Sequence, residues 1–222
     1  MEELVKRIKA IIFDLDGTLI DSTDQIYQAV SLTRKDLGFP GEELSQVESK
    51  IGLEARELFS NLGLSGHEES SVVEVFRKHL LNLRLDQSNL FDGVPKLLMW
   101  GKENGFRMAV ATNKPRHLAL KVLEETGILG FFDHVEGSDN LPSKPNPAII
   151  DRCLEILTVD RDFACMIGDR LEDTLAARAS GIKAYGVIQG HHSSEKHIEA
   201  GAEKTFQNFH SLLDFVEFGG LQ

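Results

Sequence analysis

The spacing of hydrophobic residues divides the chain into three parts. An unbroken apolar run at 11–13 (IIF) is typical of a strand buried on both faces. Apolar residues then recur at helical spacing as far as Leu83, and beyond Val94 short apolar runs alternate with helical stretches. The pattern predicts one strand, a long helical insertion, and then alternating helices and strands.

The insertion carries two apolar stripes at helical spacing, and no strand signal interrupts it. The stripes consist of Ile26, Val30, Thr33 and Leu37, and then of Val72, Val75, Phe76, His79, Leu80 and Leu83. Gly38 and Pro40 end the first helix, and a short helix is expected after Ser45. We call residues 21–91 the cap segment and expect it to be all-helical. An insertion directly after the first strand would lie over the open edge of the sheet as a lid.

The rest of the chain alternates helices and strands, which implies parallel strands with helical crossovers. Strands are predicted at 107–112, 134–136, 164–167 and 183–188, and helices at 94–104, 116–126, 147–157 and 172–180. Asn146 is expected to cap the helix that begins at Pro147, and Gly181 to end the last one. The predicted fold is α/β, a Rossmann-like parallel five-stranded sheet. Residues 1–20 and 92–222 form its core domain, and 21–91 form the inserted cap.

Composition narrows the classes of partner. The net charge of −11, without a basic run, argues against nucleic acid and anionic membranes. No apolar run is long enough to span a bilayer, and the N-terminus lacks the apolar stretch of a signal peptide. Cys153 and Cys165 lack metal-ligand spacing and are expected to be buried thiols. We expect a cytoplasmic monomer or homodimer whose partner is a small molecule.

Two carboxylates follow the first strand directly. Asp14 and Asp16 lie two residues apart, so their side chains face the same side and can divide the work of nucleophile and general acid. Gly17 suits a sharp turn, and Thr18 is expected to bond back to the loop. Asp-Gly is also a common structural turn. A calcium-binding EF-hand frame fails, because its sixth position would be Leu19 rather than glycine.

Polar residues also follow the later strands. Thr112 and Asn113 could donate to phosphoryl oxygens, or could cap the next helix. Lys144 lies between prolines in SKPNP, where it is either solvated or holds positive charge beside Asp14. Asp169 ends the fourth strand, and Asp173, in the first turn of the next helix, could equally be explained by the helix dipole.

The four acids should converge if the strands adjoin as predicted. Two negative charges about 4 Å apart repel by roughly 4 kcal/mol at an effective dielectric near 20. Such a cluster stays partly protonated unless it binds a cation. A hard divalent ion with oxygen ligands is implied, and Mg²⁺ suits phosphate chemistry best.

Four short motifs along the chain resemble, in the same order, the four motifs of the haloacid dehalogenase superfamily. They are DLDGT, TN, the lysine of SKPNP, and GD followed by a second aspartate four residues later. The chain is most similar to its phosphoglycolate phosphatase-like group with a small α-helical cap. That resemblance implies a Mg²⁺-dependent phosphatase acting on a small phosphate ester through an aspartyl-phosphate.

The resemblance also implies roles for the motif residues. Asp14 would be the nucleophile and Asp16 the general acid and base. Mg²⁺ would bind Asp14, the Asp16 carbonyl and Asp169, with Asp173 acting through water or as an orienting group. The phosphoryl oxygens would bind Thr112 and Lys144, with Asn113 supporting that loop.

The loop from Lys50 to Arg56, here called the cap loop, is expected to select the substrate. It contains Lys50, Gly52 and Arg56, and the charges of Lys50 and Arg56 make its surroundings positive. This favours a substrate with a second anionic group, although Arg56 could simply be solvated. The alternative function is a phosphosugar mutase like β-phosphoglucomutase, whose caps resemble G-x-x-R; here Ala55 stands where that arginine is expected. A phosphonatase would want a lysine within the loop, but Lys50 precedes the glycine.

The pair His191 and His192 is expected to be surface residues rather than metal ligands.

Overall fold

The computed structural model describes residues 7–41, 43–63, 69–189 and 193–221. In this part of the chain a sheet of six parallel strands has the order β3-β2-β1-β4-β5-β6. The strands are β1 (Ala10–Phe13), β2 (Arg107–Ala111), β3 (His134–Glu136), β4 (Ala164–Gly168), β5 (Lys183–Val187) and β6 (Lys204–Phe206). The predicted α/β class with a parallel sheet is confirmed, and β1 lies at its centre, where the strand order reverses.

The predicted count of five strands is wrong, because β6 pairs with β5 at the edge of the sheet. It has three residues, and the first is an exposed lysine. A run this short carries no period-two pattern, so its pairing rather than its composition makes it a strand.

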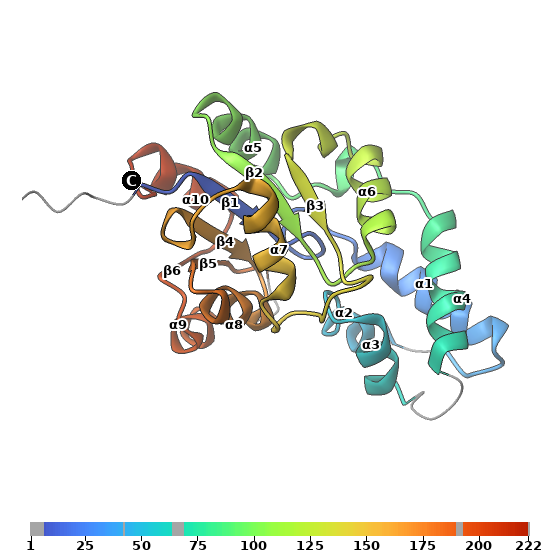
Figure 1. Cartoon of the computed structure of the whole chain (residues 1–222). Helices are drawn as coiled ribbons and strands as arrows, with labels where there is room; N and C mark the ends of the chain where they lie inside the picture. The colour runs from blue at the N-terminus through green and yellow to red at the C-terminus, as the bar shows by residue number, and fades with distance from the viewer. Residues whose placement is uncertain (1–6, 42, 64–68, 190–192, 222) are drawn as a thin grey trace, which may run out of the picture.

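Helices cover both faces of the sheet (Figure 1). They are α5 (Val94–Glu103), α6 (Arg116–Glu125), α7 (Ala148–Leu157), α8 (Leu171–Ser180), α9 (Ser194–Ala200) and α10 (Phe209–Glu217). Successive side chains of β1 point to opposite faces. Ile11 and Phe13 pack with α5, α6 and α10, whereas Ala10 and Ile12 pack with α7 and α8. The continuous apolar run of the sequence follows from this burial on both sides.

Helix ends agree with the predicted signals to within a residue. The left-handed Gly181 ends α8 at φ 76°. Asn146 makes the expected capping bond, accepting from the backbone N–H of Ala148 at 3.0 Å, but α7 begins at Ala148 rather than at Pro147. The two cysteines are free and buried, as predicted, on α7 and β4.

The described part of the cap segment is helical. It contains α1 (Thr23–Asp36), α2 (Leu44–Glu48), α3 (Ala55–Asn61) and α4 (Glu69–Asn82), which share one hydrophobic cluster. Val73 is buried in that cluster although the predicted stripe omitted it, whereas Val75 is half-buried. In Figure 1 these helices stand apart from the sheet, on the side towards which the strand arrows point.

The two ends of the cap segment lie side by side. Ile20 forms an antiparallel bridge with Leu90, and the backbone N–H of Asp21 donates to the carbonyl of Asn89 at 2.8 Å. The segment therefore leaves and re-enters the sheet-bearing part of the chain at one place.

Candidate active site

The turn after β1 holds both predicted acids out of solvent. Asp14 and Asp16 are each 4% exposed, and the backbone N–H of Asp14 still donates to the carbonyl of Ile167 in β4 at 3.0 Å. Gly17 has φ +86°, and a Cβ there would lie 2.6 Å from Oδ2 of Asp169. Only glycine lets the turn approach that carboxylate so closely.

The hydroxyl of Thr18 lies 3.4 Å from Oδ2 of Asp14, which is the predicted bond back to its own loop, and it also fixes the loop after β4. Its hydroxyl donates to Oδ1 of Asp169 at 2.6 Å and accepts from the backbone N–H of Asp169 at 3.1 Å. The turn after β1 and the end of β4 are thereby joined.

The side chain of Lys144 is bonded on all sides within the site. Its Nζ lies 2.6 Å from Oδ1 of Asp14, 2.6 Å from Oδ1 of Asp173 and 2.7 Å from the carbonyl of Ala111. All three ammonium donors are used. Burial acts to lower the pKa of Lys144, but the charges of Asp14 and Asp173 outweigh it and hold that pKa above its usual range. Lys144 is therefore a buried, permanent positive charge beside Asp14.

Three carboxylates meet beside this lysine. Oxygens of Asp14, Asp169 and Asp173 lie within 4.8 Å of one another. Burial, with a smaller contribution from the charge of Asp173, raises the pKa of Asp14 to about 7 against the opposing effect of Lys144. Burial and the charges of Asp14 and Asp173 also raise the pKa of Asp169 well above its usual range.

The donor set fits a hard cation. Oδ2 of Asp169 is buried and has no hydrogen-bond partner in the described part of the chain. An unpaired buried carboxylate oxygen is costly unless a cation or donor satisfies it. Asp173 differs, because Oδ1 accepts from Lys144 and Oδ2 accepts from the backbone N–H of Arg170 at 3.1 Å. The side chain of Asp16 lies outside this cluster.

The residues after β2 connect three parts of the site. Oδ1 of Asn113 accepts from the backbone N–H of Lys144 at 2.8 Å, and its Nδ2 donates to the carbonyl of Gly52 at 3.2 Å. Thr112 is buried, and its Oγ1 accepts from the backbone N–H of Lys114 at 3.1 Å. Neither side chain caps α6, so the helix-cap alternative fails.

Sequence analysis missed Lys114. Its Nζ lies 2.5 Å from Oδ1 of Asp16, and the two side chains are 5% and 6% exposed. Lys114 directly follows Thr112 and Asn113 at the end of a strand, which is the signal that singled out its neighbours.

Arg170 and His197 were also missed. Nη1 of Arg170 donates to the carbonyl of Ile51 in the cap segment at 2.7 Å. His197 is fully buried, with Nε2 3.0 Å from the carbonyl of Asp169 and Nδ1 3.0 Å from the hydroxyl of Thr174. Burial lowers the pKa of His197. Arg170 stood in the GDR stretch beside a predicted acid, whereas nothing near His197 in the sequence marked it.

The cap loop comes down onto the site at Gly52. This residue has φ +85°, and a Cβ there would lie 2.6 Å from Cδ of Arg170. Lys50 and Arg56 do not line the adjoining pocket. Nζ of Lys50 instead donates to the carbonyl of Gln46 at 2.7 Å, and Arg56 is exposed on α3.

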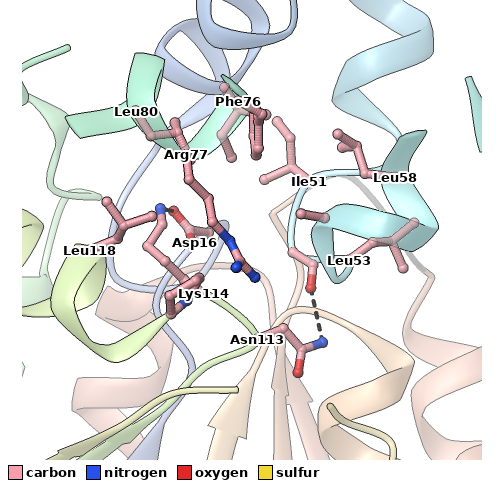
Figure 2. A pocket seen from close by; sticks show the side chains of 14 residues that line it. Asp16, Ile51, Leu53, Leu58, Phe76, Arg77, Leu80, Asn113, Lys114 and Leu118 are labelled. Atoms are coloured by element: carbon pink, nitrogen blue, oxygen red, sulfur yellow. Dashed lines mark hydrogen bonds and ion pairs between the residues drawn. The ribbon is translucent and has the colours of Figure 1, made fainter. Parts of the chain in front are cut away.

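A pocket lies between the cap segment and the loops after β1 and β2 (Figure 2). The pocket is open to solvent on one side and has a volume of about 40 Å³. Asp16, Asn113 and Lys114 border it from the core side, and Arg77 of α4 from the cap side. The predicted pair His191 and His192 lies outside the described residues.

An α/β core with buried carboxylates and a fixed ammonium at the carboxyl edge of its central strands defines an enzyme that works on a small anionic ligand. The sequence profile of the haloacid dehalogenase-like hydrolases matches residues 11–187. The chain belongs to this family.

Relatives narrow the class further. A phosphoglycolate phosphatase of Vibrio cholerae is 32% identical over 96% of this chain and 98% of its own length. A phosphoglycolate phosphatase of Aquifex aeolicus is 34% identical over 83% of this chain and 86% of its own. The crystal structure of a predicted phosphatase from Clostridium acetobutylicum superposes with a TM-score of 0.84 at 27% identity, covering 96% of this chain and 99% of that one. The chain is thus a phosphatase of this family.

Across the described residues, no helix is long and apolar enough to cross a membrane.

Proposed function

We propose that the protein hydrolyses a small phosphate monoester, of the phosphoglycolate type, through an aspartyl-phosphate on Asp14. The observation that carries the proposal is the contact between Asp14 and Lys144, because it puts a fixed positive charge beside a buried carboxylate at the carboxyl end of β1. Two relatives that match most of the chain are named phosphoglycolate phosphatases.

In the first step, a carboxylate oxygen of Asp14 attacks phosphorus, and the bond between phosphorus and the ester oxygen breaks. Asp16 gives its proton to the departing oxygen, so the alcohol leaves neutral. In the second step, Asp16 takes a proton from water, which attacks phosphorus and breaks the bond to Asp14, releasing phosphate. Asp16 suits this role because it borders the pocket where the leaving group would lie.

Thr112 would bind the phosphoryl oxygens, and the positive charge of Lys144, whose three donors are already bonded within the protein, would stabilise them. The hydroxyl of Thr112 accepts one backbone hydrogen bond, which leaves its own proton free to donate. Asn113 instead supports the loop, because its side-chain oxygen accepts from the backbone N–H of Lys144 and its side-chain nitrogen donates to the carbonyl of Gly52.

The metal would be held by Asp14, the Asp16 carbonyl and Asp169. Asp173 would position Lys144, since both of its oxygens already accept protein hydrogen bonds. When bound, Mg²⁺ would offset the negative charge of the carboxylates and the phosphoryl group.

We also propose that 21–91 act as a separate cap over a core formed by 1–20 and 92–222. The shared hydrophobic cluster of α1–α4 and the paired links at Ile20 and Leu90 support this division. A cytoplasmic location and a monomeric or homodimeric state stay predictions.

A panel of phosphate esters tests the proposal. We expect phosphate release with Mg²⁺ from 2-phosphoglycolate and similar small esters, and less from hexose phosphates and mononucleotides, because relatives that match most of the chain are phosphoglycolate phosphatases. Conversion of glucose 1-phosphate to glucose 6-phosphate without phosphate release would instead support the mutase. Failure to release phosphate from any ester would refute the proposal.

A further inference from the structure

The residue behind this inference is Arg77 on α4, which overhangs the site from the cap side. Figure 2 shows its side chain extending from α4 into the pocket, towards Asn113 and Lys114. Asp16 lines the same pocket from the core side.

The guanidinium of Arg77 is poorly satisfied by the protein. Its Nε is buried without a hydrogen-bond partner among the described residues. Within that part of the chain its one ion pair is with Oε1 of Glu54, at 4.0 Å, the outer limit of such a contact. The side chain is 38% exposed, so a ligand can reach it.

The walls of the pocket around Arg77 are largely apolar. They include Ile51, Leu58, Phe76, Leu80 and Leu118. A guanidinium stays charged in proteins and offers five N–H donors in a planar fork. The second cation of the pocket, Lys114, is already paired with Asp16 at 2.5 Å. Arg77 therefore has unused donors for an incoming anion.

The space inside this pocket suits a small anion. A volume of about 40 Å³ holds roughly three water-sized groups, so a leaving group of a few atoms fits there.

We propose that Arg77 binds a carboxylate on the leaving group of a small phosphate monoester, and so selects the substrate. The planar fork matches a carboxylate in two parallel hydrogen bonds. The inference rests on the proposed phosphatase function and assigns to Arg77 the second-anion role that the sequence suggested for Lys50 and Arg56.

A pair of matched esters tests the assignment. 2-Phosphoglycolate carries the carboxylate, and 2-hydroxyethyl phosphate has a neutral hydroxyl in its place. For Arg77→Met we expect KM for 2-phosphoglycolate to rise by about 10- to 100-fold, the loss of a charged hydrogen bond, with kcat nearly unchanged. KM for 2-hydroxyethyl phosphate should change by less than about 3-fold, which also shows that the variant is folded. Arg56→Met is the control and should leave both esters as in the wild type.

Equal effects of Arg77→Met on the two esters, or an effect of Arg56→Met as large, would overturn the assignment. Should Arg77→Met fail to fold, Arg77→Gln replaces it. Calorimetry can measure the binding of the two esters to Asp14→Asn, with and without Arg77→Met. This measurement tests the role of Arg77 separately from the proposed hydrolysis. Tighter binding of the carboxylate ester that is lost with Arg77→Met supports the inference even if the wild type hydrolyses neither ester. Equal binding of the two esters would refute the inference.

Discussion

Nζ of Lys144 lies 2.6 Å from Oδ1 of Asp14, a residue 130 positions earlier in the chain. Both side chains are almost completely buried, at 2% and 6% exposure. Each charge is tolerable there because the other is present, so the same contact serves stability and chemistry.

Replacing Lys144 with methionine should therefore lower both the stability and the phosphatase activity of the protein. Leaving Asp14 and Asp173 without their cation should cost about 3–5 kcal/mol of unfolding free energy. Phosphatase activity should fall to background, and denaturant unfolding with an ester assay would measure both. Lys50→Met is the control, since Lys50 bonds only near neighbours on the cap segment among the described residues. Equal stability of the two variants would contradict the burial argument.

Asp14→Asn should abolish hydrolysis while keeping the fold. The amide cannot form the acyl phosphate, so we expect kcat to fall by roughly 10³-fold or more. Circular dichroism and phosphate release are the measurements. Survival of most of the activity in a folded variant would rule out Asp14 as nucleophile.

Gly52→Ala should lower activity because its Cβ would meet Cδ of Arg170 at 2.6 Å and displace the cap loop. Gly38 is a matched control, with φ +74° and nothing within 4 Å of an added Cβ. Both alanines should cost about 1–2 kcal/mol of stability for the left-handed backbone. Steady-state kinetics should show a loss of kcat/KM for Gly52→Ala alone, and an active Gly52→Ala would show that the loop need not dock there.

Removal of metal should abolish activity reversibly. We expect a chelator to stop hydrolysis, Mg²⁺ to restore it, and Ca²⁺ to inhibit because its larger, looser coordination holds Asp14 out of attacking geometry. Asp169→Asn should raise the Mg²⁺ concentration needed for half-maximal rate. Full activity of the metal-free protein would refute the carboxylate argument.

The cysteines should be inert in the native protein. Burial raises the pKa of Cys165 to about 12 and holds the pKa of Cys153 above its usual range. A thiol reagent at about pH 8 should therefore label neither cysteine until the chain is unfolded, when it labels both.

The same pKa shift predicts a pH dependence of stability. The unfolded chain releases its thiol protons near pH 8.5, before the native protein does, so this contribution to stability is complete below that pH and is lost as pH rises towards about 12. Cys165→Ala should lose less unfolding free energy than the wild type between about pH 8 and pH 10. An identical loss in both would contradict the shift.

The sequence by itself determined the class of fold and which strand ends carry the polar residues that meet at the sheet edge. Buried parallel strands leave continuous apolar runs, and the polar residues that follow each run must meet at one edge of the sheet. Asp14, Thr112 and Asp169 could be placed together on that ground alone.

Only the tertiary structure decided which long side chains meet. Lys114 pairs with Asp16, Thr18 reaches Asp169, and Arg77 rather than Lys50 or Arg56 enters the pocket. Period and spacing report which face of an element a residue occupies, but not how two elements distant in sequence pack against each other. The direction of a lysine or arginine depends on that packing, as does the pairing of β6, so neither could be obtained from local pattern.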